Sequence, residues 1–205
     1  MLKIWGRKNS VNVKKVLWCV EELGVRHERV DAGMQFGVVD TPQYRRLNPN
    51  GLVPTIEEDG FVLWESHTIV RYLAAKHGGG KLWPLDLRER ADAERWMDWA
   101  FTFQAAFRAV FWGLVRTPPE KRDAAAIEDA RKKSAELLGH LDAWLAGRHY
   151  VGGRAFTMGD IPIGCHVQLW MRLPLERPKH PALEAWFARL LERPAYRAVV
   201  DIALT

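Results

Sequence analysis

The spacing of apolar residues changes near residue 80, and this change divides the chain into two parts. In the first part, short apolar runs predict strands at Leu2–Trp5 and at residues 26–31. Between these runs, apolar residues recur every three or four positions, which is the spacing of one face of a helix. They are Val13, Val16, Leu17, Val20 and Leu23. Ser10 or Asn12 can cap the start of this helix, and Gly24 can end it.

A hairpin and a second helix complete the first part. Residues 32–44 indicate a glycine-containing loop, with a short helical turn expected at Pro42–Leu47. A strand entered through Val53-Pro54 and a second strand are joined by a turn near Asp59-Gly60. The helix predicted at Ser66–His77 is followed by three glycines that stop it. Its apolar face consists of Ile69, Val70, Leu73 and Ala74.

The second part carries only helical spacing. A long periodic segment runs from residue 88 to about 115 and stops before two consecutive prolines, and another covers Ala124–Leu145. Thr157 and Asp160 have the spacing of a capping box, with Phe156 and Ile161 placed as a hydrophobic staple, for a helix that ends near residue 172. Two short helices beginning at prolines 181 and 194 finish the chain.

These elements predict two domains. Residues 1–80 have the order strand, helix, strand, loop, strand, strand, helix, which indicates an α/β layer with a small mixed sheet. Residues 81–87 form a linker, and residues 88–205 form an all-α domain.

The stretch from Asn48 to Ser66 has features suited to a ligand. A proline at a strand start removes a ladder donor and leaves the neighbouring backbone edge free to pair with something else. The helix start at Ser66, preceded by Glu65, offers unpaired N–H groups that suit a carboxylate. Together they predict a site for a small peptide-like ligand.

Composition narrows the class of protein without identifying a function. The 205 residues are 48% hydrophobic and 27% charged, and no apolar run approaches the roughly 20 residues of a membrane span. The net charge is +5, but basic residues are interspersed with acidic ones, and no nucleic-acid or zinc-binding spacing is present. With two isolated cysteines and a start that enters a strand directly, we expect a cytoplasmic protein without nucleic-acid or membrane partners and without a metal.

Four short motifs, taken in order, resemble those of the cytosolic glutathione transferases over the whole chain. They are Ser10 with Asn12, Asn48-Pro49-x-x-x-Val53-Pro54, Glu65-Ser66, and Thr157-x-x-Asp160. The start of the first helix is similar to bacterial members of the serine or asparagine type, which are theta-like or nu-like. The resemblance implies a thioredoxin-like N-terminal domain with a four-stranded sheet and a helical C-terminal domain. It also implies glutathione as co-substrate and a homodimer.

The resemblance assigns recognition of glutathione to the second half of the first domain. The position of Val53 implies backbone pairing with the cysteinyl part of glutathione, next to a cis proline at Pro54. Glu65 and Ser66 match the residues that hold the γ-glutamyl end. Further candidate contacts are Gln35 and Asn50. Thr157 and Asp160 are expected to be structural.

Activation of the thiol is assigned to the first helix. Ser10 matches the hydroxyl donor of serine-type classes, and Asn12 stands where some bacterial classes use an amide, so both remain candidates. Cys19 and Cys165 are expected to be small core residues rather than nucleophiles. In the family the long helix lines the pocket for the electrophile. The residues expected there are Phe103, Phe107, Phe111 and Trp112.

Three functions follow from these expectations. The first is a glutathione transferase that delivers a thiolate to an apolar electrophile between the domains. The second is a glutathione-dependent disulfide or peroxide reductase that uses no protein cysteine, which Asn12 favours. The third is a non-catalytic binding or regulatory module on the same fold.

Overall fold

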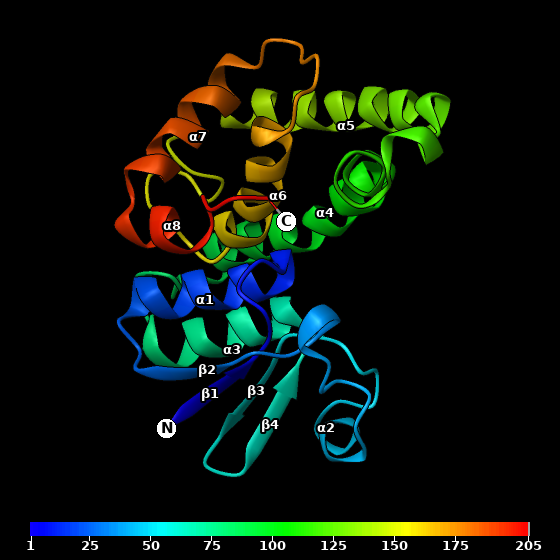
Figure 1. Ribbon diagram of the computed structural model, residues 1–205. Coiled ribbons are helices and arrows are strands. Elements are labelled where there is room, and N and C mark those ends of the chain that lie inside the picture. Colours follow the sequence, from blue (N-terminus) through cyan, green and yellow to red (C-terminus); the bar gives the residue numbers. More distant parts are fainter. Residues whose placement is uncertain (205) are drawn as a thin grey trace.

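The computed structural model describes residues 1–204 and confirms an α/β part followed by an all-helical part (Figure 1). The elements are β1 (Leu2–Trp5), α1 (Val11–Leu23), β2 (His27–Val30), η1 (Met34–Phe36), α2 (Pro42–Leu47), β3 (Thr55–Glu58), β4 (Phe61–Trp64), α3 (Ser66–His77), α4 (Leu87–Phe111), η2 (Trp112–Arg116), η3 (Pro119–Lys121), α5 (Ala124–Leu145), α6 (Asp160–Arg172), α7 (Pro181–Glu192) and α8 (Pro194–Val199). None of the described helices is long and apolar enough to span a membrane.

The four strands form one mixed sheet in the order β2-β1-β3-β4. β1 pairs in parallel with β2, whereas β3 pairs antiparallel with both β1 and β4. Side chains alternate along β1, so that Leu2 and Ile4 are buried while Lys3 and Trp5 are only partly covered. Ile4 lies opposite Ile56 of β3, and both are fully buried. One face of the sheet is therefore the base of the apolar core.

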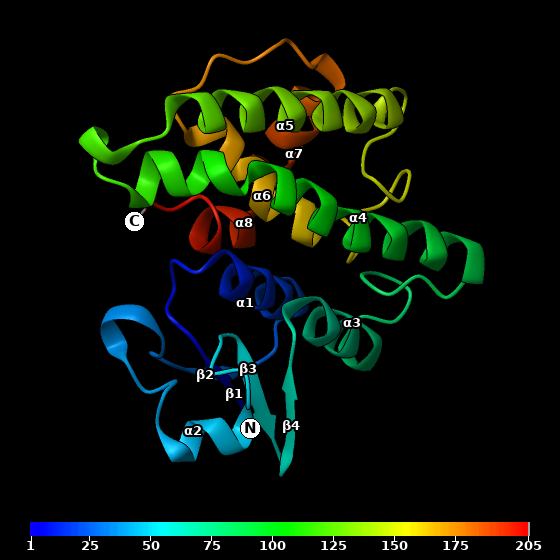
Figure 2. The same cartoon turned by 90° about the vertical axis from the view of Figure 1, so that its right-hand side faces the viewer.

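α1 lies at the centre of the molecule. In both views α1 and α3 lie between the sheet and helices α4–α8, while α2 lies beyond the sheet (Figures 1 and 2). The spacing predicts one buried face for α1, but every residue from 13 to 20 is buried, including Lys14 and Lys15. The reason is that α3 covers one side of α1 and helices α6 and α8 cover the other.

Trp18 joins the two parts of the molecule. Its ring lies 5.2 Å from that of Phe156 and 4.7 Å from that of Tyr196, both in the helical part. A Cβ atom at Gly164 of α6 would lie only 2.9 Å from Cζ3 of Trp18. Glycine at this position therefore allows α6 to approach the indole closely.

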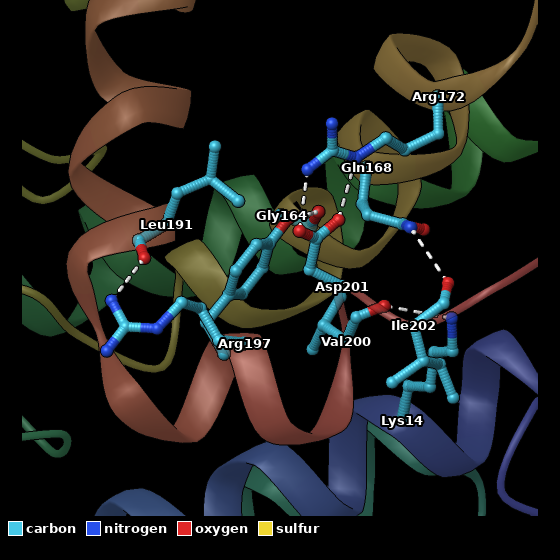
Figure 3. A network of polar contacts seen from close by, with 10 residues as sticks. Lys14, Gly164, Gln168, Arg172, Leu191, Arg197, Val200, Asp201 and Ile202 are labelled. Carbon is cyan, nitrogen blue, oxygen red and sulfur yellow. Dashed lines mark hydrogen bonds and ion pairs between the residues drawn. The ribbon is translucent and has the colours of Figure 1, made fainter.

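The chain beyond α8 is held against α1 and α6 (Figure 3). Arg172 of α6 pairs with Asp201 at 2.6 Å, and Lys14 of α1 donates to the carbonyl of Val200 at 3.0 Å. The amide of Gln168 also donates to the carbonyl of Ile202, at 3.5 Å. These contacts fix the path of the last described residues.

The long helix of the second part ends differently from the prediction. The sequence predicts one helix to about residue 115, but α4 ends at Phe111 and continues as the π-helical turn η2. A Cβ atom at Gly113 would lie 2.5 Å from Cδ1 of Ile127, so the chain passes very close to α5 there. Arg122 closes the segment by donating to the carbonyls of Leu114 and Thr117.

The capping residues before α6 form a buried polar network. One oxygen of Asp160 accepts from the N–H of Val151 at 3.0 Å and from Nε1 of Trp186 at 2.9 Å. The other oxygen accepts from the N–H of Thr157 at 3.0 Å, as expected of a capping box. The Thr157 hydroxyl accepts from Gly159, at 3.3 Å, rather than from the N–H of Asp160. Burial raises the pKa of the Asp160 carboxyl to about 6, and its three donors oppose this shift.

We expect Asp160→Ala to lower the free energy of unfolding by more than about 3 kcal/mol, because three buried donors lose their acceptor. Urea unfolding at pH 7 measures this difference. The matched control is Asp129→Ala, on the exposed face of α5, which should change stability by less than about 0.5 kcal/mol. Equal effects of the two substitutions would contradict the structural role of Asp160.

Candidate functional site

A cavity of about 570 Å³ lies where the two parts of the molecule meet. Its wall is formed by the turn before α1, the start of α1, the chain before Pro54, the second half of α4 with η2, and the end of the chain. Six of the predicted site residues line it. They are Ser10, Asn12, Val53, Phe107, Phe111 and Trp112.

The other six predicted site residues do not line this cavity. They are Gln35, Asn50, Pro54, Glu65, Ser66 and Phe103. Phe103 is fully buried, with its ring stacked against those of Trp99 and Phe107, so its expected contact with substrate is not supported. Besides Phe107 and Phe111, α4 lines the cavity with Phe101, Gln104, Ala105 and Arg108, and Trp112 is the first residue of η2.

Ser10 has a side chain that is free to bind a ligand. It lies at the N-cap position of α1 in an extended conformation, and its carbonyl accepts the first helical hydrogen bond, from the N–H of Lys14. Its hydroxyl makes no capping hydrogen bond, although its residue type favours one. The side chain is only 7% exposed and lines the cavity. The hydroxyl can therefore donate to a group bound in the cavity.

Asn12 is oriented by a buried lysine. Nζ of Lys15 lies 2.9 Å from Oδ1 of Asn12 and 2.9 Å from Nε2 of His67. Since an ammonium only donates, both atoms must accept. The amide NH₂ of Asn12 is thus left as a donor at the cavity wall.

The positive charge of Lys15 lies in the protein interior. Lys15 is fully buried, which lowers its pKa to about 8, and the negative charge of Glu65 partly opposes this shift. Burial, with the charges of Lys15 and Arg71, lowers the pKa of His67 to about 2. His67 is therefore neutral, and its Nε2 can accept from Lys15. At neutral pH the protonated lysine brings a positive charge close to Asn12 and the start of α1.

The chain before Pro54 lines the cavity and contains unpaired backbone. The Val53–Pro54 peptide bond is cis, as the resemblance implies. Within residues 1–204, neither the N–H nor the carbonyl of Val53 makes a hydrogen bond. The preceding carbonyl, that of Leu52, accepts from the Tyr44 hydroxyl at 2.7 Å and from Nδ2 of Asn48 at 2.9 Å. These two bonds hold the turn that presents Val53.

The sequence reasoning missed the role of this support. Both Tyr44 and Asn48 also contact the Thr55 hydroxyl, at 2.9 and 3.1 Å. Asn50, a candidate ligand contact, donates its N–H and its amide to Oδ1 of Asn48 and so helps to shape the same turn. Gln35 lies exposed in η1. The motif Asn48-Pro49-x-x-x-Val53-Pro54 was the signal in the sequence that could have indicated this supported turn.

Glu65 and Ser66 form a helix start that is ready for an anion. The carbonyl of Glu65 accepts from the N–H of Ile69, so the N–H groups of the first turn of α3 have no helical partner. Glu65 has a φ of 72°, a left-handed conformation that costs a non-glycine residue about 1–3 kcal/mol. Its carboxylate is exposed and makes no hydrogen bond or ion pair in the described part of the chain.

Comparison with known proteins identifies the family. Residues 9–76 match the glutathione S-transferase N-terminal domain, and residues 99–194 match the glutathione S-transferase C-terminal domain. The chain is 45% identical to glutathione S-transferase GstB of Escherichia coli (strain K12), with both sequences covered completely.

Solved structures agree with this comparison. A theta class glutathione S-transferase from Xanthomonas axonopodis pv. citri, with glutathione bound, aligns with a TM-score of 0.96 and 52% identity, over 100% of this chain and 99% of that chain. Glutathione transferase F7 from Populus trichocarpa aligns with a TM-score of 0.88 and 25% identity, over 98% of both chains. The chain therefore belongs to the glutathione S-transferase family.

Proposed function

We propose that this glutathione transferase binds glutathione against Val53, ionises its thiol at the start of α1, and delivers the sulfur to an apolar electrophile. One observation carries the proposal. Val53, whose backbone is unpaired, and Ser10 and Asn12, which have free donors, are residues of the same cavity wall. A peptide held by that backbone would have its cysteinyl side chain within the cavity that those donors line.

Recognition of glutathione would extend from Val53 toward α3. The N–H and carbonyl of Val53 would pair with the cysteinyl residue of the ligand. The free carboxylate of Glu65 would accept from the γ-glutamyl ammonium, and the first turn of α3 at Ser66 would receive the α-carboxylate. Gln35 and Asn50 remain candidates for further contacts.

Ionisation of the thiol requires a modest free energy. A free thiol has a pKa of about 8.5, and lowering it by about 2 units takes roughly 2.7 kcal/mol of preferential thiolate stabilisation. One hydrogen bond to a charged group contributes about 1.5–3 kcal/mol. The Ser10 hydroxyl and the Asn12 amide could supply this, helped by the dipole of α1 and the ammonium of Lys15.

Neither cysteine of the protein can act in place of glutathione. Burial raises the pKa of Cys165 to about 12, and burial also raises the pKa of Cys19. Both side chains are fully buried and make no disulfide. Either candidate reaction, conjugation or reduction, would therefore use the thiol of glutathione.

The two parts of the chain would divide the work. In this proposal, residues 1–80 bind glutathione, residues 81–87 are the linker, and residues 88–205 supply the wall that faces the electrophile. We also propose a homodimer, in which the α/β part of one subunit packs on the helical part of the other, and a cytoplasmic location. Exposed apolar side chains on β4 and at the start of α4 support the dimer. They are Phe61, Trp64 and Leu87.

The first prediction concerns the thiol. Ser10→Ala and Asn12→Ala test the two donors, and loss of the residue that bonds to sulfur should raise the pKa of bound glutathione by about 1–2 units. Lys15→Met should raise it in the same direction, because the Asn12 amide loses its anchor and the site loses a positive charge. Thiolate absorbance against pH, with glutathione saturating, measures this pKa. An unchanged pKa in all three variants would rule out activation at α1.

The same variants separate conjugation from reduction. The Asn12 amide, held by Lys15, is the feature that keeps the reductase as the second candidate. In an assay of glutathione-dependent reduction of a small disulfide, a loss specific to Asn12→Ala would favour the reductase. Parallel losses in conjugation of an aryl halide, with no disulfide reduction by the wild type, would favour the transferase.

A further prediction concerns binding. Glu65→Gln should weaken glutathione binding about tenfold, because one charged acceptor for the ligand's ammonium becomes neutral. Isothermal titration measures the Kd, and Glu28→Gln on the exposed edge strand β2 is the control, expected to bind as the wild type does. Absence of binding by the wild type at millimolar glutathione would instead favour a non-catalytic module.

The dimer can be tested by sedimentation. At micromolar concentration the wild type should sediment at twice the monomer mass, and Phe61→Glu should shift the population toward monomer because it places a charge within an apolar contact. A monomeric wild type at tens of micromolar would overturn this part of the proposal.

A further inference from the structure

The cavity has a basic wall that an apolar electrophile does not require. Four basic side chains line it, and no aspartate or glutamate is among its described lining residues. The four are Arg7, Lys14, Arg108 and Arg116. Lys14 is already engaged, since it donates to the carbonyl of Val200. The other three therefore need a separate explanation.

The three arginines have no counter-ion within residues 1–204. Some arginines elsewhere in the molecule pair with carboxylates, as Arg172 does with Asp201 and Arg193 does with Glu22, both at 2.6 Å, while others make no ion pair but do not share one cavity. No ion pair involves Arg7, Arg108 or Arg116. Arg108 is exposed, but Arg7 and Arg116 are partly buried, and two partly buried like charges at one cavity repel each other unless an anion occupies the site.

Arg116 lies close enough to Arg7 to act on its charge. Burial lowers the pKa of Arg7, and the positive charge of Arg116 lowers it further. Nε of Arg7 is buried and has no hydrogen-bond partner. A buried guanidinium nitrogen without an acceptor, beside a second guanidinium, is the arrangement that a bound carboxylate would satisfy.

The rest of the cavity wall suits an aromatic ring. Phe107, Phe111 and Trp112 line it, and Cζ of Arg116 lies 5.8 Å from the centre of the Phe111 ring. Arg108 and Arg116 belong to α4 and η2, on the helical side of the cavity, whereas Val53 lies on the sheet side. These two arginines therefore face the space left for the second substrate.

We propose that the electrophile is an aromatic molecule that carries a carboxylate, with its ring against Phe107, Phe111 and Trp112 and its carboxylate held by Arg116 together with Arg108 and Arg7. This rests on the proposed function, since it names the class of molecule that accepts the sulfur. A planar guanidinium can bind a carboxylate through two parallel hydrogen bonds. The anion thereby fixes which end of the ring faces the sulfur.

The reaction leaves the carboxylate unchanged. With an aryl chloromethyl substrate, the thiolate sulfur attacks the benzylic carbon, one carbon–sulfur bond forms, and the carbon–chlorine bond breaks with its electron pair on chloride. The thiol proton has already gone to solvent. The products are the thioether, chloride and one proton, and no oxidant or reductant takes part.

The test compares two electrophiles that differ in charge. 4-(Chloromethyl)benzoate and 4-(chloromethyl)benzamide have the same leaving group and nearly the same size. Each enzymatic kcat/KM is divided by the spontaneous rate constant of that electrophile with glutathione. We expect the wild type to favour the benzoate about 10- to 100-fold, and Arg116→Leu to lose most of this preference. Arg116→Lys, which keeps the charge, should restore part of it.

Arg88→Leu is the matched control. Arg88 lies on α4 about 30 Å from Arg108 at 1.5 Å per residue, is exposed, and should leave the preference unchanged. The same preference in the wild type and in Arg116→Leu would overturn the proposal. If Arg116→Leu also raises the Kd for glutathione while its preference for the benzoate stays unchanged, the arginine binds a carboxylate of glutathione and not that of the electrophile.

Two unreactive analogues test the anion site without relying on catalysis. Calorimetric titration of glutathione-saturated protein with 4-methylbenzoate and 4-methylbenzamide measures the anion site without turnover. Tighter binding of the benzoate, reduced in Arg116→Leu, supports the proposal even if neither chloromethyl compound is a substrate. Equal affinities overturn it, whatever the conjugating activity of the enzyme.

Discussion

The contact between α1 and α6 is the constraint on which the rest of the structure depends. Trp18 of α1 packs against Gly164 at a distance that a Cβ atom would not allow, and against Phe156 and Tyr196. α1 thus belongs to the cores of both parts of the molecule at once. Its first turn consequently has a fixed position relative to both walls of the cavity. Preorganised donors stabilise developing charge most effectively when they need not move.

The same burial explains the polar groups along α1. A helix covered on every side has no exposed face for its lysines, so Lys14 and Lys15 must find acceptors in the interior. Lys14 binds the carbonyl of Val200 and holds the chain after α8, while Lys15 binds Asn12 and His67. α1 therefore fixes the segment after α8, which contributes Ala203 and Leu204 to the cavity. It also orients the amide of Asn12, another residue of the cavity wall.

Local rules in the sequence predicted most of the fold. Prolines at helix starts, glycines at helix ends and the capping spacing of Thr157 and Asp160 each act over a few residues. α5 has the predicted bounds and α6 the predicted end, but α6 begins at Asp160, after Gly159, and not directly after Thr157. The burial of residues 13–20 of α1 on every side and the π-helical turn after α4 depend on neighbours far away in the chain, which periodicity cannot reveal. The predicted site residues stay predictions, and the structure adds where they lie. Ser10, Asn12 and Val53 line one cavity, whereas Phe103 lies in the core.

The residues that were missed share one property. In the sequence, Arg7, Arg108 and Lys15 look like ordinary solvent-exposed charged residues. Only the packing of distant elements places the arginines at a cavity and Lys15 in the core. The available signal was the helical spacing of Phe101, Gln104, Ala105 and Arg108, which lie on α4 beside its buried face. The sequence motifs therefore identified the polar donors of the cavity, and the structure was needed to find the charges around it.

A crystal structure with glutathione bound tests the central claim most directly. The account predicts the sulfur within about 3.5 Å of Nδ2 of Asn12 or the hydroxyl of Ser10, with the cysteinyl backbone paired to Val53. A sulfur atom more than about 5 Å from both donors, without an intervening water, would contradict it.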